Sequence, residues 1–276
     1  MAKLTAEQEW LATQPLWGER LPVRDGSLEK YCPVEFGITC RYLERYVPNN
    51  AVVADVGVGV GHYAEFLARR GCSVYLVDIS VELLQAARQR LERAGLGGQV
   101  QEVRRASATD LGWLRSGSLD AVLMLGPFYH LQELHERRQA VSEARRILKP
   151  QGILFAAAVN RLAYLRDLFR EKPAEVLERA AFHARFLKDG RLDPEHAPPL
   201  GYAHLTNALE FRNLFEDAFE EVALVGTESF VSAWQSKLNE LPPDAREAWL
   251  DLVEETGKTP EGIGQSDHFL FIGKRL

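Results

Sequence analysis

The sequence predicts an α/β fold, a mainly parallel sheet with helices on both faces. Short apolar runs alternate with helical patterns from about residue 50 to about residue 160, and a glycine-rich turn follows the first run directly. Strict β–α alternation of this kind specifies parallel strands connected by crossover helices. Ligands of such sheets bind outside the carboxyl ends of the strands, so we expect the functional site at that edge.

Each element follows from a local pattern. Three helical patterns lie between the apolar runs of residues 50–160. Ser80 is placed to cap the second of these helices. Thr206 is placed to cap a later helix, 206–218. Apolar runs of strand length occur at 51–56, 73–78, 99–104, 119–125, 152–159, 219–226 and 268–276.

Helical segments flank this core. Residues 33–48 predict one amphipathic helix before the first strand. A helical pattern and then a Pro-rich, His-bearing loop follow the fifth strand, and residues 229–256 are helical in pattern again. The sequence holds no internal repeat and no low-complexity tract.

Composition excludes several classes of protein. The chain has 276 residues, of which 46% are hydrophobic and 26% charged, as in ordinary globular proteins. The sequence has no run of about 18 apolar residues, so it predicts no membrane span. Its first residues lack the pattern of a secretory signal. The three cysteines fit neither a disulfide framework nor a zinc site. We therefore expect a cytoplasmic protein.

Charge argues against a nucleic-acid substrate. The formal net charge is −6, and the densest basic segment, 137–146, has the spacing of a solvated helix face. No stretch gathers enough Lys and Arg without interleaved acids to follow a phosphate backbone. We expect no nucleic-acid partner and no membrane partner.

The glycine-rich turn is the strongest functional signal. Gly57, Gly59 and Gly61 stand at alternate positions after the first strand, and Asp55 precedes them inside the strand. Glycine permits a sharp turn and a close approach of a ligand to the backbone. The dinucleotide fingerprint would place its third glycine at 62, where the chain has His62. The spacing therefore weakens the hypothesis that the loop binds a nicotinamide cofactor. A tight turn that binds no ligand remains an alternative.

This D-x-G-x-G-x-G motif resembles the first motif of the class I S-adenosylmethionine-dependent methyltransferases, of the small-molecule type that carries methyltransferase domain 11 or 25. The similarity extends in order over about 110 residues, 51–160, and includes "MLGPFYHL" (124–131) and "LKPQG" (148–152). It implies a Rossmann-like seven-stranded sheet whose last strand is antiparallel to the others. It also implies S-adenosyl-L-methionine as cofactor and S-adenosyl-L-homocysteine as product.

The resemblance assigns further cofactor contacts. Asp78, followed by Ile79, ends the second strand, where an acidic residue can accept hydrogen bonds from ribose hydroxyls. The family often has an acid before a small residue at the positions of Ser107 and Ala108, which contact the adenine. Because Ser107 replaces that acid, Asp110 or the backbone around Ala108 is the expected contact.

Four more residues are candidates for the site around the methyl group. Leu125 begins the loop that, in the family, passes beneath the sulfonium. His130 and Tyr129 follow in the same loop, where the acceptor is expected, and either serves catalysis or only shapes the pocket. Tyr31 resembles an aromatic that other members place over the cofactor, although simple packing explains it as well.

The segments outside the core resemble the caps of small-molecule methyltransferases. We expect residues 1–50 to form an N-terminal helical cap, and residues 51–276 to form the methyltransferase domain with lid insertions at about 160–215 and 227–267. Such caps favour a small-molecule acceptor with an oxygen, nitrogen or carbon nucleophile. The acceptor, the use of a general base and the oligomeric state are not determined by the sequence.

Two further patterns resemble a metal site and a hydrolase triad, but neither has the spacing that such a site needs. His130 and His135 are five residues apart, off the spacing of a helical metal pair, and no metal site is expected. Ser266, Asp267 and His268 stand side by side, but hydrolase triads are assembled from separated segments, and the chain has no G-x-S-x-G elbow. We expect Ser266 and Asp267 to form a turn before the last strand.

Two other functions remain as alternatives. One is a non-catalytic protein that binds S-adenosylmethionine for regulation, since a fold does not guarantee a reaction. The weaker one is an NAD(P)-dependent oxidoreductase, because an acid at the position of Asp78 is shared with that class.

Overall fold

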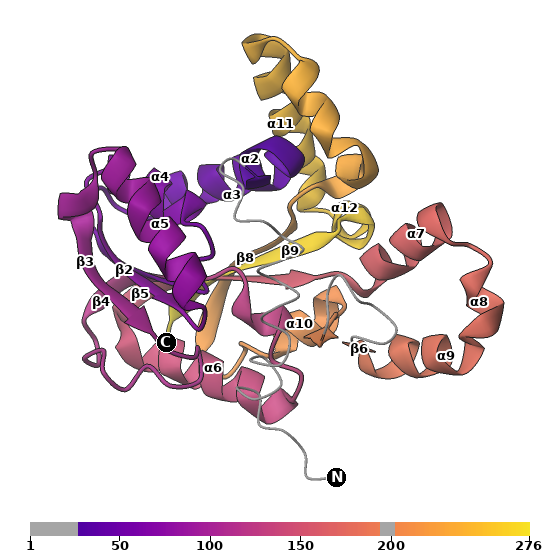
Figure 1. The fold of residues 1–276 in the computed structure, drawn as a ribbon, viewed down its shortest axis with the longest axis horizontal. Helices are drawn as coiled ribbons and strands as arrows, with labels where there is room; N and C mark the ends of the chain where they lie inside the picture. Colours follow the sequence, from indigo (N-terminus) through magenta and orange to yellow (C-terminus); the bar gives the residue numbers. More distant parts are fainter. Residues whose placement is uncertain (1–26, 194–201) are drawn as a thin grey trace.

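A seven-stranded sheet forms the centre of the protein (Figure 1). The computed structural model describes residues 27–193 and 202–276. The sheet has the strand order β3-β2-β1-β4-β5-β9-β8, and β9 is antiparallel to both of its neighbours. The strands are β1 (Val52–Val56), β2 (Ser73–Asp78), β3 (Val100–Arg105), β4 (Leu119–Met124), β5 (Leu148–Val159), β8 (Phe219–Gly226) and β9 (His268–Arg275).

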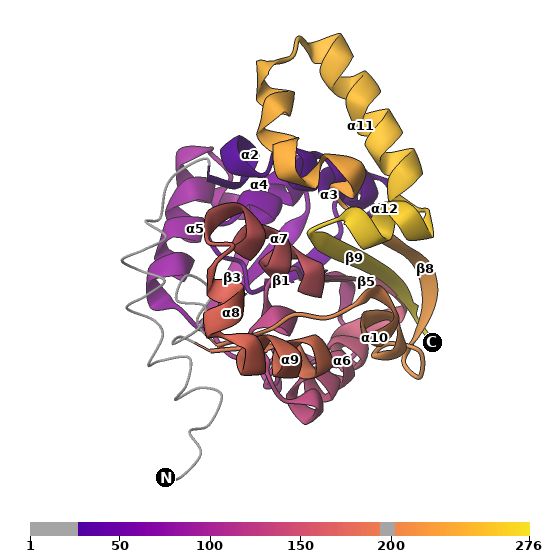
Figure 2. The same ribbon diagram turned by 90° about the vertical axis from the view of Figure 1, so that its right-hand side faces the viewer.

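Helices cover both faces of this sheet, as Figure 2 shows from the side. On one face lie α3 (Pro33–Tyr46), α4 (His62–Arg69) and α5 (Val81–Arg93), whose apolar side chains share a core with β1 and β2. On the other face, α6 (Leu134–Ile147) and α10 (Ala208–Asn213) pack with β4 and β5 around a second core. The central strands are buried on both sides, which explains their almost unbroken apolar runs.

Further helices extend beyond the carboxyl edge of the sheet. After β5 the chain forms α7 (Arg161–Glu171), α8 (Glu175–Glu178) and α9 (Ala180–Asp189), an arc that projects to the right in Figure 1. This arc, the small pair β6 (Arg191–Leu192) and β7 (Ala203–His204), and the half-buried Tyr129 share a third core. No helix in the described residues is long and apolar enough to span a membrane.

The segment between β8 and β9 is also helical. It contains η3 (Ser229–Glu240), α11 (Pro243–Gly257) and α12 (Pro260–Gln265), and it packs against α3. The expected helix 229–256 is thus broken, since Pro242 and Pro243 end one helical segment and begin the next. A short α2 (Ser27–Tyr31) precedes α3. The remaining short elements are η1 (Gly97–Gln99) and η2 (Pro127–Tyr129).

The fold class expected from the sequence is confirmed. All seven strands occur within a few residues of their expected bounds, and β9 is the antiparallel strand inserted next to β5. Ser80 caps α5, where its Oγ accepts from the Leu83 N–H at 3.2 Å. The cap expected at Thr206 is wrong. Asn207 caps α10 by accepting from the Glu210 N–H, while Thr206 is buried in a bridge to Asn160.

Candidate functional site

The glycine loop connects β1 to α4 at the carboxyl edge of the sheet. The N–H of Gly57 donates to the Val77 carbonyl of β2 at 2.8 Å, which continues the sheet pairing into the loop. Gly57 has a φ of +78°, and a Cβ there would lie 2.8 Å from Pro127 Cδ. A side chain at this position would therefore strain the backbone and push away the start of η2.

The other two glycines of the loop differ in their surroundings. A Cβ on Gly61 would lie 3.0 Å from Ala87 Cβ of α5, so this glycine permits close packing of the two helices. Gly59 has a φ of +55°, yet a Cβ there would have no heavy atom within 4 Å. The open space beside Gly59 is where a ligand can approach the backbone of the loop.

Asp78 joins this loop to the end of β2. Its Oδ2 accepts from the Gly59 N–H at 3.0 Å, and its Oδ1 accepts from the Ser80 N–H at 2.9 Å. Burial raises the pKa of Asp78 to about 6, against the effect of these backbone N–H groups. A buried carboxylate with lone pairs still available is well suited to accept two hydroxyl groups of a ribose.

Asp55 lies beneath the loop and is only 3% exposed. Burial, together with the negative charge of Asp78, raises the pKa of Asp55 to about 7, and the backbone N–H of Ala64 opposes the rise. The carboxylate therefore holds the first turn of α4 against the end of β1. Two acidic groups facing one small region make this part of the site electronegative.

The loop after β3 contains the expected adenine contacts. Ser107 Oγ is 2.8 Å from Thr109 Oγ1 and accepts from the Thr109 N–H. Asp110 is exposed, and its Oδ1 accepts from the Gly112 N–H at 3.4 Å. Ala108 is buried, and the half-buried Ile79 accepts at its carbonyl from Arg105.

The loop after β4 brings the expected catalytic residues next to the segment that follows β5. Leu125 packs against the core that includes α4, and Tyr129 packs against the third core, formed by α7, α9, β6 and β7. The rings of Tyr129 and His130 lie 4.6 Å apart. Burial lowers the pKa of His130 to about 4, although a hydrogen bond with the Tyr202 backbone opposes the shift. The imidazole of His130 is thus neutral near pH 7 and hydrogen-bonded to the backbone just before β7.

Tyr31 and His62 lie at the rim of the site. Tyr31 ends α2, is half exposed, and has the ammonium group of Lys30 5.2 Å from its ring centroid. His62 begins α4, and its Nδ1 is 3.3 Å from Glu29 Oε1. His62 Nε2 is buried and has no hydrogen-bond partner among the described residues.

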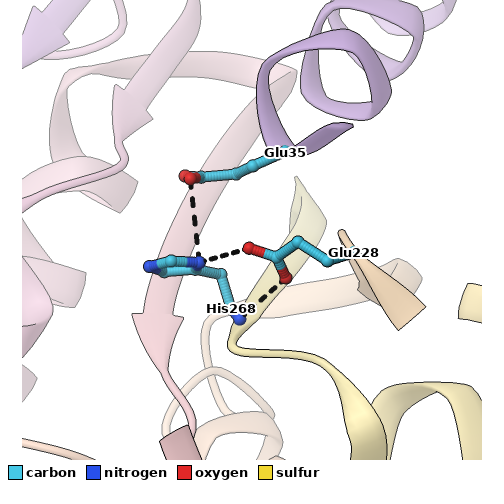
Figure 3. A group of neighbouring side chains, drawn as sticks. All are labelled: Glu35, Glu228 and His268. Carbon is cyan, nitrogen blue, oxygen red and sulfur yellow. Dashed lines mark hydrogen bonds and ion pairs between the residues drawn. The ribbon is translucent and has the colours of Figure 1, made fainter. Parts of the chain in front are cut away.

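A cluster that the sequence did not reveal lies at the same edge, formed by Glu35, Glu228 and His268 (Figure 3). Glu35 comes from the first turn of α3, Glu228 follows β8, and His268 begins β9. His268 Nδ1 is 2.5 Å from Glu228 Oε1 and 3.7 Å from Glu35 Oε2. In the sheet, His268 pairs with Val159, the last residue of β5.

Electrostatics fix the charges of this cluster. Burial alone would lower the pKa of His268, but the charges of Glu35 and Glu228 raise it to about 10. The resulting imidazolium holds the pKa of Glu228 below its usual value despite complete burial. Burial raises the pKa of Glu35, and the charge of His268 offsets part of this rise.

The Ser-Asp-His run does not form a hydrolase triad in the structure. The buried Ser266 donates its hydroxyl to Glu228 Oε2 at 2.5 Å and accepts from the N–H groups of Glu228 and Ser229. Asp267 pairs with Arg166 of α7. Ser266 therefore anchors Glu228 and does not contact the imidazole of His268.

The spacing within the cluster would also permit a metal ion. One ligand atom from each of the three residues lies within 4.8 Å of the others. Glu228 Oε2, however, already accepts from Ser266 Oγ and from the His268 N–H, and Oε1 accepts from the imidazole. Ca²⁺ and Mg²⁺ usually take more oxygen ligands than this leaves. We interpret the cluster as an ion-pair network.

Comparisons with known proteins agree with this arrangement. Residues 54–156 match the family model described as a methyltransferase domain. A ubiquinone biosynthesis O-methyltransferase of Xanthomonas oryzae pv. oryzae is 33% identical over 147 residues, which cover 51% of this chain and 59% of that protein. A ribosomal RNA small subunit methyltransferase C of Alcanivorax borkumensis is 33% identical over 124 residues, 42% of this chain and 34% of that protein.

Solved structures share the fold over a longer stretch. A SAM-dependent methyltransferase of Methanosarcina mazei has a TM-score of 0.58 at 21% identity, and the match covers 85% of this chain and 97% of that one. The chain spans little more than half the length of the ubiquinone enzyme that it matches.

Proposed function

We propose that the protein is an S-adenosylmethionine-dependent methyltransferase that acts on a small-molecule acceptor, because residues 54–156 match the methyltransferase domain model. The observation that carries the proposal is the joining of the glycine loop to Asp78. The carboxylate, buried at the end of β2, accepts the Gly59 N–H beside open space at the loop. This is the place where a nucleoside with two ribose hydroxyls binds in such a fold.

The residues present fit the proposed cofactor. Asp78 is expected to hold the ribose, the backbone around Ala108 the adenine, and the loop 57–61 the methionine portion. The electronegative surroundings of Asp55 and Asp78 suit a donor that carries a positive sulfonium. When bound, that sulfonium supplies an activated methyl group, and the chain supplies alignment and exclusion of water.

The acceptor side is built from segments outside the matched domain. Tyr129 lies at the boundary between β4 and the core of the lid formed by α7, α9, β6 and β7. α3, η3 and α11 roof the adjacent edge near β8 and β9. Helical segments that cover this edge from two sides suit a small metabolite. We therefore assign these segments as the acceptor caps, in line with the expected lid insertions at about 160–215 and 227–267.

RNA is the second candidate acceptor, because one relative is a ribosomal RNA methyltransferase. The net charge of −6 and the absence of an unbroken basic segment in the sequence argue against it. The interpretation as a small-molecule enzyme is further supported by the ubiquinone enzyme among the relatives. The cytoplasmic location stays a prediction of the sequence.

Isothermal titration tests the cofactor. We expect S-adenosylhomocysteine to bind and NAD not to bind. Absence of S-adenosylhomocysteine binding would contradict the proposal, and NAD binding alone would favour an oxidoreductase.

Labelled S-adenosylmethionine then tests the reaction. The purified protein is incubated with the labelled donor in two separate reactions. One reaction contains a metabolite extract, and the other contains total RNA. Label in a small product supports the proposed function, and label in RNA would favour the second candidate. A protein that binds the donor but labels neither fraction would be the non-catalytic binder.

A further inference from the structure

Glu35 and His268 face a common region at the carboxyl edge of the sheet, outside the cofactor loop. Glu228 is fully buried, whereas the side chains of Glu35 and His268 are 16% and 25% exposed. Figure 3 shows the second ring nitrogen of His268 on the side away from Glu228, with the Glu35 carboxylate next to the same ring. The open side of the cluster thus presents one carboxylate and one imidazole edge.

The two carboxylates of the cluster differ in how well they are satisfied. Glu228 takes the short bond from His268 Nδ1 and accepts three more hydrogen bonds, from Ser266 Oγ, Thr227 Oγ1 and the His268 N–H. Glu35 is 3.7 Å from the same nitrogen and interacts otherwise with the thiol of Cys32. Glu228 therefore fixes the imidazole, and Glu35 is the carboxylate that retains capacity for another proton donor.

Tyr129 connects the position of Glu35 with the edge of the sheet where the glycine loop lies. Burial raises the pKa of the Tyr129 phenol, and the negative charges of Glu35 and of Asp78 raise it further. Tyr129 also packs against the core that contains Val159, the residue of β5 that pairs with His268 in the sheet. This places the open side of the cluster next to the loop where the acceptor is expected.

We propose that Glu35 takes the proton from an O–H group of the acceptor, while His268, oriented by Glu228, donates a hydrogen bond from Nε2 to one lone pair of the same oxygen. This inference rests on the proposed function and names its acceptor class, a small molecule with a hydroxyl group. Glu35 and His268 are then catalytic residues, and Glu228 is a positioning residue.

The step balances without another reactant. The second lone pair of the acceptor oxygen forms the bond to the methyl carbon. The carbon–sulfur bond breaks, and its electron pair stays on sulfur, which becomes the neutral thioether of S-adenosylhomocysteine. The acceptor's proton passes to Glu35. The positive charge of the donor favours the ionised form of Glu35 before the transfer.

Sinefungin, which carries a protonated amine in place of the methylsulfonium, provides a test that needs no acceptor. Its affinity and that of S-adenosylhomocysteine are measured by calorimetry for the wild type, Glu35→Gln and Glu44→Gln, an exposed glutamate of the same helix. We expect Glu35→Gln to weaken sinefungin about tenfold, by loss of one nearby charge, with S-adenosylhomocysteine affinity unchanged. Glu44→Gln should change neither affinity.

The outcomes separate this inference from the proposed function. If the wild type does not bind S-adenosylhomocysteine, the proposed function fails first. If it does, and the ratio of the two affinities is the same in Glu35→Gln as in the wild type, Glu35 does not face the methyl group and the inference is overturned.

Kinetics with the labelled product give a second readout. Glu35→Gln is expected to lower kcat about a hundredfold, as loss of a general base does, with the KM of the donor unchanged. Glu35→Asp should recover part of the rate. Glu228→Gln should raise the KM of the acceptor and shift the alkaline limb of the pH profile. Full activity of Glu35→Gln would rule out the proposed proton transfer.

Discussion

The Asp78 carboxylate accepts a hydrogen bond from the Gly59 backbone N–H at 3.0 Å, and this bond joins the glycine loop to the second strand. The two residues are 19 positions apart, but the parallel pairing of β1 with β2 brings their strand ends together. The bond sets the loop conformation and leaves the open side of Gly59 beside the carboxylate. The same carboxylate can thus organise the loop and bind a ligand.

Replacement of Asp78 by Ala should weaken S-adenosylhomocysteine binding by about 1.5–3 kcal/mol, because the ribose loses its acceptor and the loop loses a bond. Asp110→Ala removes the same charge from an exposed position on the loop after β3, and it separates the two expected adenine contacts. We expect its affinity within about twofold of the wild type if the backbone around Ala108 holds the adenine. Calorimetry measures both. A large loss in Asp110→Ala would instead assign the adenine contact to Asp110.

Two glycines of the loop, Gly57 and Gly59, should differ in the effect of an added methyl group. Gly57→Ala combines a φ of +78° with a contact of 2.8 Å to Pro127, so we expect the free energy of unfolding to fall by about 2 kcal/mol or more. Gly59→Ala meets no atom within 4 Å, and its stability should fall by only about 1 kcal/mol, while ligand affinity falls more. Urea unfolding and calorimetry, with Gly98→Ala as control, separate the two effects. Equal loss of stability in both variants would contradict this distinction.

Asp55→Asn should stabilise the protein at alkaline pH. The folded-state pKa of Asp55 is raised to about 7, so the fold disfavours the charged form, and the stability contributed by this group falls as pH rises from about 4 through about 7. Near pH 8 the amide removes that cost, and we expect a gain of about 2 kcal/mol, or roughly 5 °C in Tm. Near pH 4 the gain should vanish. Thermal melts at both values check this, and an equal gain at the two would show that charge burial is not the cause.

The fold could be predicted from the sequence because the patterns that specify each strand and helix are local. Each strand of the sheet is a short apolar run, and the parallel connections follow from the helices between the runs. The prediction that Thr206 caps a helix is wrong because a contact between distant segments decides which residue caps it. Two neighbouring residues, Thr206 and Asn207, can both cap a helix, and only the bridge from Thr206 to Asn160 decides between them.

The candidate site was predictable in part. Gly57, Gly59, Gly61 and Asp78 form a pattern within one β–α–β unit, so their spacing carries the information. Glu35, Glu228 and His268 come from three distant segments, and each is an ordinary charged residue in its own context. They meet because β9 inserts between β5 and β8, while α3 covers that edge. The only local signal was the polar group of Ser266, Asp267 and His268 before a buried strand.

The pair of Glu228 and His268 should also make stability depend on pH at the alkaline side. The folded-state pKa of His268 is raised to about 10, above the value of about 6.5 for an unfolded histidine. The stabilisation by this imidazolium is therefore fully present below about pH 6.5 and is lost as pH rises through about 10. Glu228→Gln removes the partner charge, so its unfolding free energy near pH 7 should drop by about 3 kcal/mol and then change little up to pH 10. Urea unfolding near pH 7 and pH 10 measures the loss, with Glu44→Gln as the control. Histidine ring nitrogen NMR reports the charge directly, and a His268 imidazole that is neutral near pH 8 would disprove the pairing.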